Sequence, residues 1–137
     1  MPKWEIHDKW AQKKGLSQEV SNYVNQLSDF PEQSHEFIQF CEHEGVEIVL
    51  QLVTAHDFKL IMNIPKYLQV EFMRRKGSGF VTAWYLHYVL DYIKMAPALT
   101  LEDVISRTRG KFGTCQELEA INDFVLDHAE EILHDCR

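Results

Sequence analysis

The sequence predicts a mainly α-helical protein, a compact bundle of about six or seven helices around a buried central helix at residues 80–95. Three observations favour this fold class. Apolar residues recur every three to four positions along most of the chain, residues that cap helices precede several of these stretches, and residues 80–95 are apolar on nearly every side. A chain of 137 residues with 45% hydrophobic content has the size and composition of one globular domain, 1–137.

Three helices are predicted in the first 45 residues. The first ends at Gly15, a residue type that is common just beyond a helix C-terminus. Ser17 is placed to cap the second helix, and Asp29 with Pro31 is placed to open the third, which ends before Gly45. The apolar residues that define the second helix by their spacing are Leu16, Val20, Tyr23, Val24 and Leu27.

Residues 46–64 fit two structures. The apolar residues Val46, Ile48, Leu50 and Leu52 follow the alternation of a strand, but Val46, Val49, Leu50 and Val53 equally satisfy helical spacing. Because β-branched residues are abundant here, a β-hairpin that turns at 54–57 is an alternative to a buried helix.

The helical pattern returns at Pro65. A helix is expected over 66–76, followed by Gly77-Ser78-Gly79 and then by the central helix, which Pro97 ends. Thr100 with Asp103 resembles a capping box, and helices are predicted at about 101–109 and 115–135.

The charge of the chain falls into three blocks of alternating sign. Basic and acidic residues number four and ten over 1–58, nine and four over 59–111, and one and seven over 112–137. We favour the interpretation that these blocks face one another in the fold or across a dimer; the alternative is that the basic middle presents an anion-binding face. The overall net charge of −7 argues against general nucleic-acid binding.

A reducing, cytoplasmic location is expected. The chain has three widely spaced cysteines and no Cys-x-x-Cys pair, a pattern that favours neither a disulfide framework nor a structural zinc site. Its N-terminus is charged from Lys3 onwards and lacks the apolar run of a secretory signal. The longest apolar stretch, 80–96, contains charged residues and is short for a membrane span.

Seven histidines make metal binding a candidate function. His35, the adjacent pair His56-Asp57 and the distant Asp91 together resemble, in outline, the HD-type metal-dependent phosphohydrolases. In that family a His, a His-Asp pair and a later Asp hold a divalent ion, which activates water against a phosphate ester. The local similarity covers residues 52–59 and lacks the glycine that usually follows the pair.

His87 and Asp91 stand four residues apart on the central helix and therefore share one face of it. This polar stripe is either a ligand or acid–base pair inside a pocket, or a strip that faces solvent. Because Lys94 continues the stripe and lysine is rarely buried, the solvent-facing interpretation is favoured.

Two basic segments contain glycine: one precedes the central helix, and the other lies at the end of the helix that follows it. Both are expected to be loops, at 74–79 and 107–113, and the lengths of the two helices bring them to the same end of the molecule. Their cations are candidates for binding a phosphorylated ligand or a short single-stranded nucleic acid: Arg74, Arg75, Lys76, Arg107, Arg109 and Lys111.

The sequence as a whole favours a non-catalytic interaction or regulatory module that self-associates. Trp4 and Trp10 are difficult to bury on one short terminal helix, so a protein partner or a second copy of the chain is expected to cover them. The alternatives are the metal-dependent phosphohydrolase, which would need a divalent metal as cofactor, and the phosphate-ligand binder. No catalytic residue is predicted outside the metal-site hypothesis.

Overall fold

The computed structural model describes residues 3–43 and 66–137. Eight α-helices and one short 3₁₀ helix make up nearly all of these residues, so the prediction of a mainly α-helical bundle is confirmed. The predicted alternatives for 46–64, a hairpin or a helix, lie outside the described residues. Within the described ranges, no helix is both long enough and apolar enough to cross a membrane.

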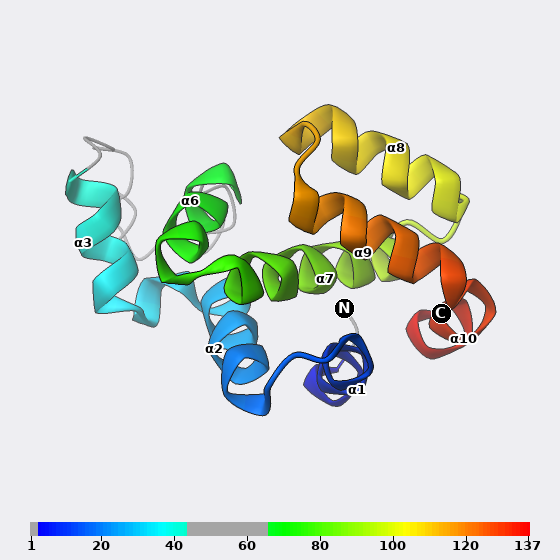
Figure 1. Ribbon diagram of the computed structural model, residues 1–137, viewed down its shortest axis with the longest axis horizontal. Helices are drawn as coiled ribbons and strands as arrows, with labels where there is room; N and C mark the ends of the chain where they lie inside the picture. The colour runs from blue at the N-terminus through cyan, green and yellow to red at the C-terminus, as the bar shows by residue number, and fades with distance from the viewer. Residues whose placement is uncertain (1–2, 44–65) are drawn as a thin grey trace.

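The helix α7, Ser78–Met95, runs through the middle of the molecule, and six other helices pack around it (Figure 1). These are α1, α2, α6, α8, α9 and α10. The residues of α7 that are buried cover nearly its whole circumference, as its apolar sequence predicts. The central helix is therefore confirmed, and it begins two residues earlier than expected, after Gly77, whose φ of 140° favours glycine.

The first two helices, α1 (Trp4–Lys14) and α2 (Gln18–Asp29), lie where the sequence places them. The Ser17 side chain accepts a hydrogen bond from the backbone N–H of Val20 at 3.2 Å, which caps α2. Gly15 has a φ of 90°, which ends α1 and turns the chain into α2.

The third predicted helix begins later than expected. Pro31–Gln33 forms the 3₁₀ helix η1, and α3 covers His35–His43 after it. Ser34 accepts a hydrogen bond from the N–H of Phe37 and so does the capping that the sequence suggested for Asp29. The carboxylate of Asp29 consequently remains available for contacts elsewhere.

The second half of the chain differs from expectation in two places. Helix α6, Lys66–Lys76, agrees with the prediction, and α8 begins with the expected capping box of Thr100 and Asp103. However, both predicted basic loops are mostly helical: α8 extends over Leu101–Phe112 and takes in most of 107–113, and in 74–79 only Gly77 lies outside a helix. The predicted helix 115–135 is two helices, α9 (Gln116–Asp127) and α10 (Ala129–Cys136). His128 lies between them with non-helical φ and ψ of −119° and 28°.

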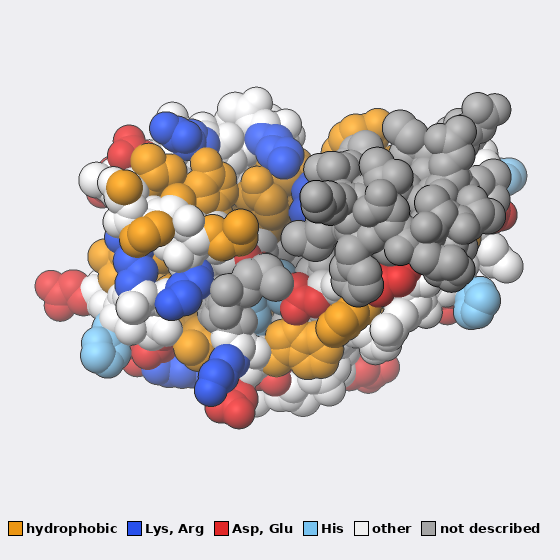
Figure 2. Space-filling view, turned by 180° about the vertical axis from the view of Figure 1, so that it is seen from behind, with side chains coloured by type: hydrophobic (Ala, Val, Ile, Leu, Met, Phe, Trp, Pro, Cys, Tyr) orange, Lys and Arg blue, Asp and Glu red, His pale blue; other side chains and the backbone are white. Residues whose placement is uncertain are grey.

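The three charge blocks face one another. Ion pairs join the basic middle of the chain to both acidic ends, through Lys76 with Glu36 and through Arg109 with Glu119. On the face in Figure 2, the Lys and Arg side chains lie among acidic and hydrophobic ones and do not form one continuous patch. The favoured interpretation of the charge pattern, mutual pairing within the fold, therefore agrees with these contacts.

Glu117 carries the most buried of these contacts. Its residue is 7% exposed, its Oε2 accepts a hydrogen bond from Ser78 Oγ at 2.9 Å, and Arg74 Nη1 lies 3.3 Å from the same oxygen. Burial acts to raise the pKa of Glu117, but the hydrogen bonds from its own backbone N–H, Ser78 and Arg74 outweigh burial and hold the pKa below its usual value. This carboxylate therefore fastens the start of α9 to α6 and α7.

Truncating a side chain in the middle of α7 should destabilise the whole fold. We expect Leu90→Ala to lower the free energy of unfolding by about 2–5 kcal/mol, because Leu90 is fully buried and its loss leaves a cavity. Met95→Ala, at an exposed position of the same helix, should change it by less than about 0.5 kcal/mol. Urea denaturation measures both; equal effects would mean that α7 is not the centre of the core.

Replacing Glu117 should give a pH-dependent loss of stability. The lowered folded-state pKa means that ionised Glu117 stabilises the fold above its unfolded pKa of 4.5, and that this stabilisation is lost as pH falls through the folded pKa. Glu117→Gln should cost about 1–3 kcal/mol at neutral pH, and the difference from wild type should shrink at about pH 3.

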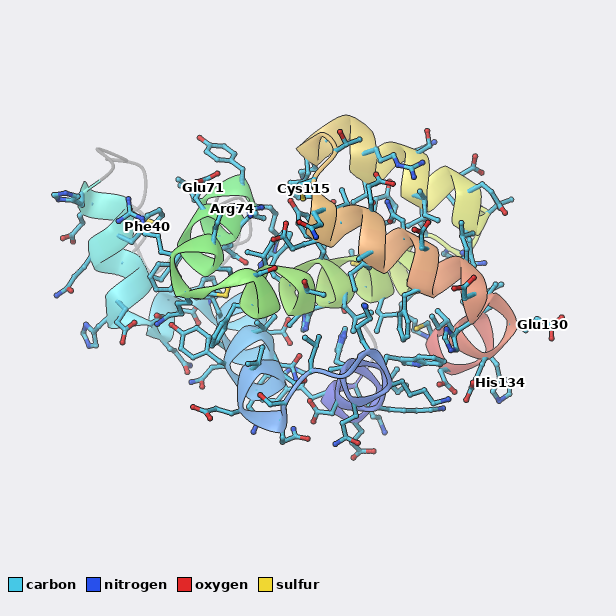
Figure 3. All side chains as sticks on the ribbon, viewed as in Figure 1. Phe40, Glu71, Arg74, Cys115, Glu130 and His134 are labelled. Atoms are coloured by element: carbon cyan, nitrogen blue, oxygen red, sulfur yellow. The ribbon has the colours of Figure 1, made fainter. Side chains whose placement is uncertain are left out.

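Glu130→Gln is the matched control, because Glu130 is exposed and points away from α10 (Figure 3). Its urea midpoint should follow that of the wild type across the same pH range. A loss in Glu117→Gln that is as large at low pH as at neutral pH would contradict the assigned role of the charge.

Candidate functional site

Four titratable side chains meet where α1, α2 and α7 pack together, and we call them the histidine–aspartate cluster: His7, Asp29, His87 and Asp91. The two histidines are each 3% exposed, and the carboxylate side chains of Asp29 and Asp91 are 17% and 16% exposed. The imidazole rings stack with centroids 3.8 Å apart and planes 8° apart. Such a concentration of polar groups in a helical core is unusual and requires an explanation.

Helix geometry and helix packing bring the cluster together. His87 and Asp91 share one face of α7 because they are four residues apart, and this face is covered by α1 and α2. Asp91 Oδ1 lies 3.0 Å from His7 Nε2, and Asp91 Oδ2 lies 3.2 Å from His87 Nε2. From the end of α2, Asp29 Oδ1 lies 3.3 Å from His87 Nε2. Both Nε2 atoms therefore face carboxylate oxygens.

A second layer of hydrogen bonds orients these groups. Trp4 Nε1 donates to Asp29 Oδ2 at 2.6 Å, which leaves Asp29 Oδ1 directed at His87. Asn25 Nδ2 donates to Asp8 Oδ1 at 3.0 Å, and Asn25 Oδ1 lies 2.8 Å from His87 Nδ1. Supporting contacts of this kind commonly surround histidines that bind metal ions.

These contacts decide which ring nitrogen of His87 carries a proton. The Asp8 carboxylate accepts hydrogen bonds, so the amide nitrogen of Asn25 must face it and the amide oxygen must face His87. The N–H at His87 Nδ1 therefore donates a hydrogen bond to Asn25 Oδ1, and Nε2 is directed at two carboxylates. That arrangement requires a positive charge at Nε2, supplied either by a second proton or by a cation.

The electrostatics of the cluster leave it negative. Burial lowers the pKa of His7, and neighbouring His87 lowers it further, so His7 stays neutral near pH 7. Burial also opposes protonation of His87, but its hydrogen bonds to Asp29 and Asp91 outweigh burial and raise its pKa. The pKa values of Asp29 and Asp91 are held below their usual range by hydrogen bonds to the histidines in spite of burial. The raised pKa of His87 favours its protonated form, so at most one positively charged imidazole faces the two carboxylates.

The spacing of the cluster suits a divalent ion. His7, His87 and Asp91 each offer a ligand atom, and these atoms all lie within 4.8 Å of one another. Ligands that lie about 2.0–2.2 Å from a shared ion are themselves about 2.9–3.5 Å apart. Two separations in the cluster are in this range: His7 Nε2 lies 3.0 Å from Asp91 Oδ1, and His87 Nε2 lies 3.2 Å from Asp91 Oδ2. Two imidazoles and a carboxylate are ligands that Zn²⁺, Mn²⁺ and Fe²⁺ accept. Asp29 is positioned as a fourth ligand or as a base beside them.

A pocket of about 70 Å³ adjoins the cluster. Among the described residues, Asp29, His87 and Asp91 form one part of its lining, and Lys66, Ser28, Trp84 and Tyr88 form the rest. Asp29 and Asp91 therefore border this pocket, whereas His7 lines a separate, smaller cavity with Ala11 and Val24.

The predicted metal ligands are brought together only in part. Asp91 belongs to the cluster, but His35 is exposed at the start of α3, which packs against α6 and η1 at one end of the molecule (Figure 1). His35 is therefore not a ligand of this site. His56 and Asp57 lie outside the described residues.

The solvent-facing interpretation of the His87–Asp91 stripe is wrong for both residues. Lys94 is exposed as expected, but His87 is buried and Asp91 is largely covered, because α1 and α2 lie over this part of α7. The sequence reasoning missed His7 and Asp29. The one available signal was that His7 shares the apolar face of α1 with Trp10 and Ala11, which are also buried.

The predicted anion-binding residues do not form an open cationic site. The two basic segments do converge on the start of α9, where Arg74 pairs with Glu117 and Arg109 pairs with Glu119. Figure 3 shows Arg74 on the side of α6 that faces Cys115. The other members have separate positions: Lys76 pairs with Glu36, Arg75 lies over the Phe40 ring, Lys111 lies over the Tyr88 and Phe112 rings, and Arg107 is exposed on α8.

The two N-terminal tryptophans have different surroundings. Trp10 is fully buried by its own chain, and its Nε1 donates to Asp135 Oδ2 at 2.9 Å, so the prediction that a partner covers it is wrong. The helix α10 and the ring of Phe124 supply the cover that a short terminal helix lacks. Trp4 is 40% exposed, and its place in an interface stays a prediction.

Comparisons with protein-family models, with curated proteins and with solved structures found no match for this chain.

Proposed function

We propose that this protein is a metal-dependent hydrolase, in which His7, His87 and Asp91 hold a divalent cation and Asp29 stands beside it. The observation that carries the proposal is the arrangement at His87. Its Nδ1 donates to Asn25, and its Nε2 faces two carboxylates that a cation would hold together. A bound divalent cation supplies Lewis acidity, which polarises a water molecule or a substrate oxygen.

The surrounding residues support hydrolysis rather than a purely structural ion. Three side chains hold the ion, which leaves coordination positions for water and substrate, whereas structural zinc sites are closed by four protein ligands. The adjoining pocket gives access to these positions. Asp29, oriented by Trp4, is placed to accept a proton from water at the pocket side of the cluster.

The two histidines have separate supporting roles in this proposal. Asn25 and Asp8 hold the His87 ring in the tautomer that presents the Nε2 lone pair to the ion. His7 brings a ligand from α1, so binding the ion would tie this N-terminal helix to α7. Metal binding should therefore also stabilise the folded chain.

Elemental analysis of the untagged, purified protein tests this proposal. We expect close to one equivalent of zinc, manganese or iron per chain, and hydrolysis of the generic phosphate esters p-nitrophenyl phosphate or bis(p-nitrophenyl) phosphate that a chelator abolishes. Asp91→Asn should remove the metal and the activity together. Asn25→Ala, which removes the hydrogen bond to His87 Nδ1 together with the one to Asp8 and leaves the metal ligands in place, should weaken metal binding by about 10–100-fold.

His35→Ala is the matched control, since His35 is exposed and outside the cluster. It should retain the metal, the activity and the rise in melting temperature on metal binding. At a free metal concentration 100 times the dissociation constant, binding should stabilise the fold by about 2.7 kcal/mol. A folded wild-type protein that takes up none of these ions would overturn the proposal.

Self-association is a second candidate function, favoured by an exposed aromatic pair. Trp4 and Phe30 are 40% and 39% exposed, and their rings meet edge to face with centroids 6.2 Å apart. Exposed aromatic residues are common at the centres of protein interfaces. In this proposal a second copy of the chain covers the pair.

Phe30→Ser should then shift the protein from dimer towards monomer in sedimentation velocity, because it removes apolar contact area while leaving the Trp4 bond to Asp29 in place. Leu126→Ser, which changes an equally exposed residue on α9, should leave the mass unchanged. A monomeric wild-type protein would exclude this candidate without affecting the metal site.

A further inference from the structure

Lys66 lines the pocket beside the histidine–aspartate cluster, and its charge is not paired with any residue of the cluster or of the described helices around it. It is the first residue of α6, it is only partly exposed, and it lines the pocket together with Asp29 and Asp91. Within the part of the chain that the structure describes, its ammonium group makes no hydrogen bond or ion pair. A lysine withdrawn from water without a contacting anion is costly and therefore uncommon.

The electrostatic surroundings of Lys66 suit the binding of an anion. Burial lowers the pKa of Lys66, while the charges of Asp91 and Asp29 act to raise it. Those carboxylates are already engaged with His7 and His87, and they are not in contact with the ammonium group. If a divalent ion occupies the cluster, the carboxylate charges are offset further, and the pocket becomes attractive to an anion.

Ser28 supplies a second unused donor in the same pocket. Its Oγ is buried and has no hydrogen-bond partner among the described residues, although buried hydroxyl groups are normally paired. Ser28 and Lys66 come from different helices, α2 and α6, and both line the pocket beside the cluster. An unpaired ammonium group and an unpaired hydroxyl, on two residues of the same pocket lining, are suited to the oxygens of an oxyanion.

The size of the pocket limits the anion. One water-sized group needs roughly 10–15 Å³ of cavity volume. The pocket of about 70 Å³ therefore has room for about five groups of that size. A phosphoryl group with its oxygens has this size, whereas a nucleobase or a sugar would have to remain outside. The aromatic side chains of Trp84 and Tyr88 line other parts of the pocket and offer no competing charge.

We propose that this pocket is the phosphoryl-binding subsite of the enzyme, in which Lys66 and Ser28 hold the phosphate oxygens of a phosphate-ester substrate beside the cation. The inference rests on the proposed function and names its substrate class. Lys66 acts as a binding residue and not as an acid or base. The remainder of the substrate extends from the mouth of the pocket.

Isothermal titration of the full-length protein with inorganic phosphate tests the subsite without measuring activity. We expect the metal-loaded wild type to bind phosphate and Lys66→Met to bind it at least about tenfold more weakly, because a charged hydrogen bond is lost while the aliphatic stem is kept. Ser28→Ala should weaken binding by about threefold. The metal content of both variants should equal that of the wild type.

Lys94→Met is the matched control, since it removes the same charge from an exposed position of α7. Its affinity for phosphate should stay within about twofold of the wild type. Titrations with sulfate and acetate show whether the site selects dianionic tetrahedral groups or accepts any anion. We expect phosphate to bind most tightly. Acetate that binds as tightly as phosphate would overturn the substrate class.

The possible failures are distinguishable. If the wild type binds metal but no phosphate, or if Lys66→Met binds phosphate as tightly as the wild type, the subsite is wrong and the metal site stands. If the wild type takes up no metal but binds phosphate in a Lys66-dependent way, the proposed hydrolase is wrong and the anion site stands.

Discussion

His87 lies in the middle of the central helix, 3% exposed, and all of its polar contacts must be supplied by the protein. A buried imidazole that lacks hydrogen-bond partners would cost several times the usual contribution of one hydrogen bond. The helices around α7 meet this requirement: α2 provides Asn25 and Asp29, and α7 itself provides Asp91. The stacked ring of His7 adds α1 to the same point. The positions of the two N-terminal helices on α7 are therefore fixed by one buried polar unit as well as by apolar packing.

The cluster and the surface ion pairs differ in what their charges do. At the surface, oppositely charged residues such as Arg109 and Glu119 neutralise one another, and such exposed pairs contribute little to stability. Inside the cluster, two carboxylates are held near two imidazoles, and burial keeps the His7 imidazole from balancing their charge because it lowers the pKa of His7. A partly buried site with unbalanced negative charge is an expected place for a cation, and perturbed titratable groups are concentrated at functional sites.

Lys66 gives the lining of the pocket both signs of charge. The carboxylates of Asp29 and Asp91 belong to this lining, and so does Lys66, whose ammonium group has no contacting anion among the described residues. Hydrolysis of a charged ester needs both features, because the ion must be held by negative ligands while the anionic substrate must be attracted to it. The same small pocket contains both, which links the proposed metal site to a substrate class.

The sequence by itself determined the helices and much of their order, because helix formation depends on periodicity and on residues close together in the chain. Ser17, the Thr100–Asp103 pair and the apolar circumference of residues 80–95 were sufficient to place α2, α8 and α7. Local spacing also placed His87 and Asp91 on one face. It did not find the break at His128 or the continuation of α8 through Gly110, because a glycine lowers helix propensity without necessarily ending a helix.

Only the tertiary structure decided which face of α7 is buried and which distant residues reach it. His7 and Asp91 are 84 positions apart, and no periodicity within one helix indicates which other helix will cover it. The same limit applies to Trp10, which is buried by α10 and not by a partner. Sequence spacing specifies which side chains share a helix face, whereas a site made from three helices depends on how those faces pack against one another.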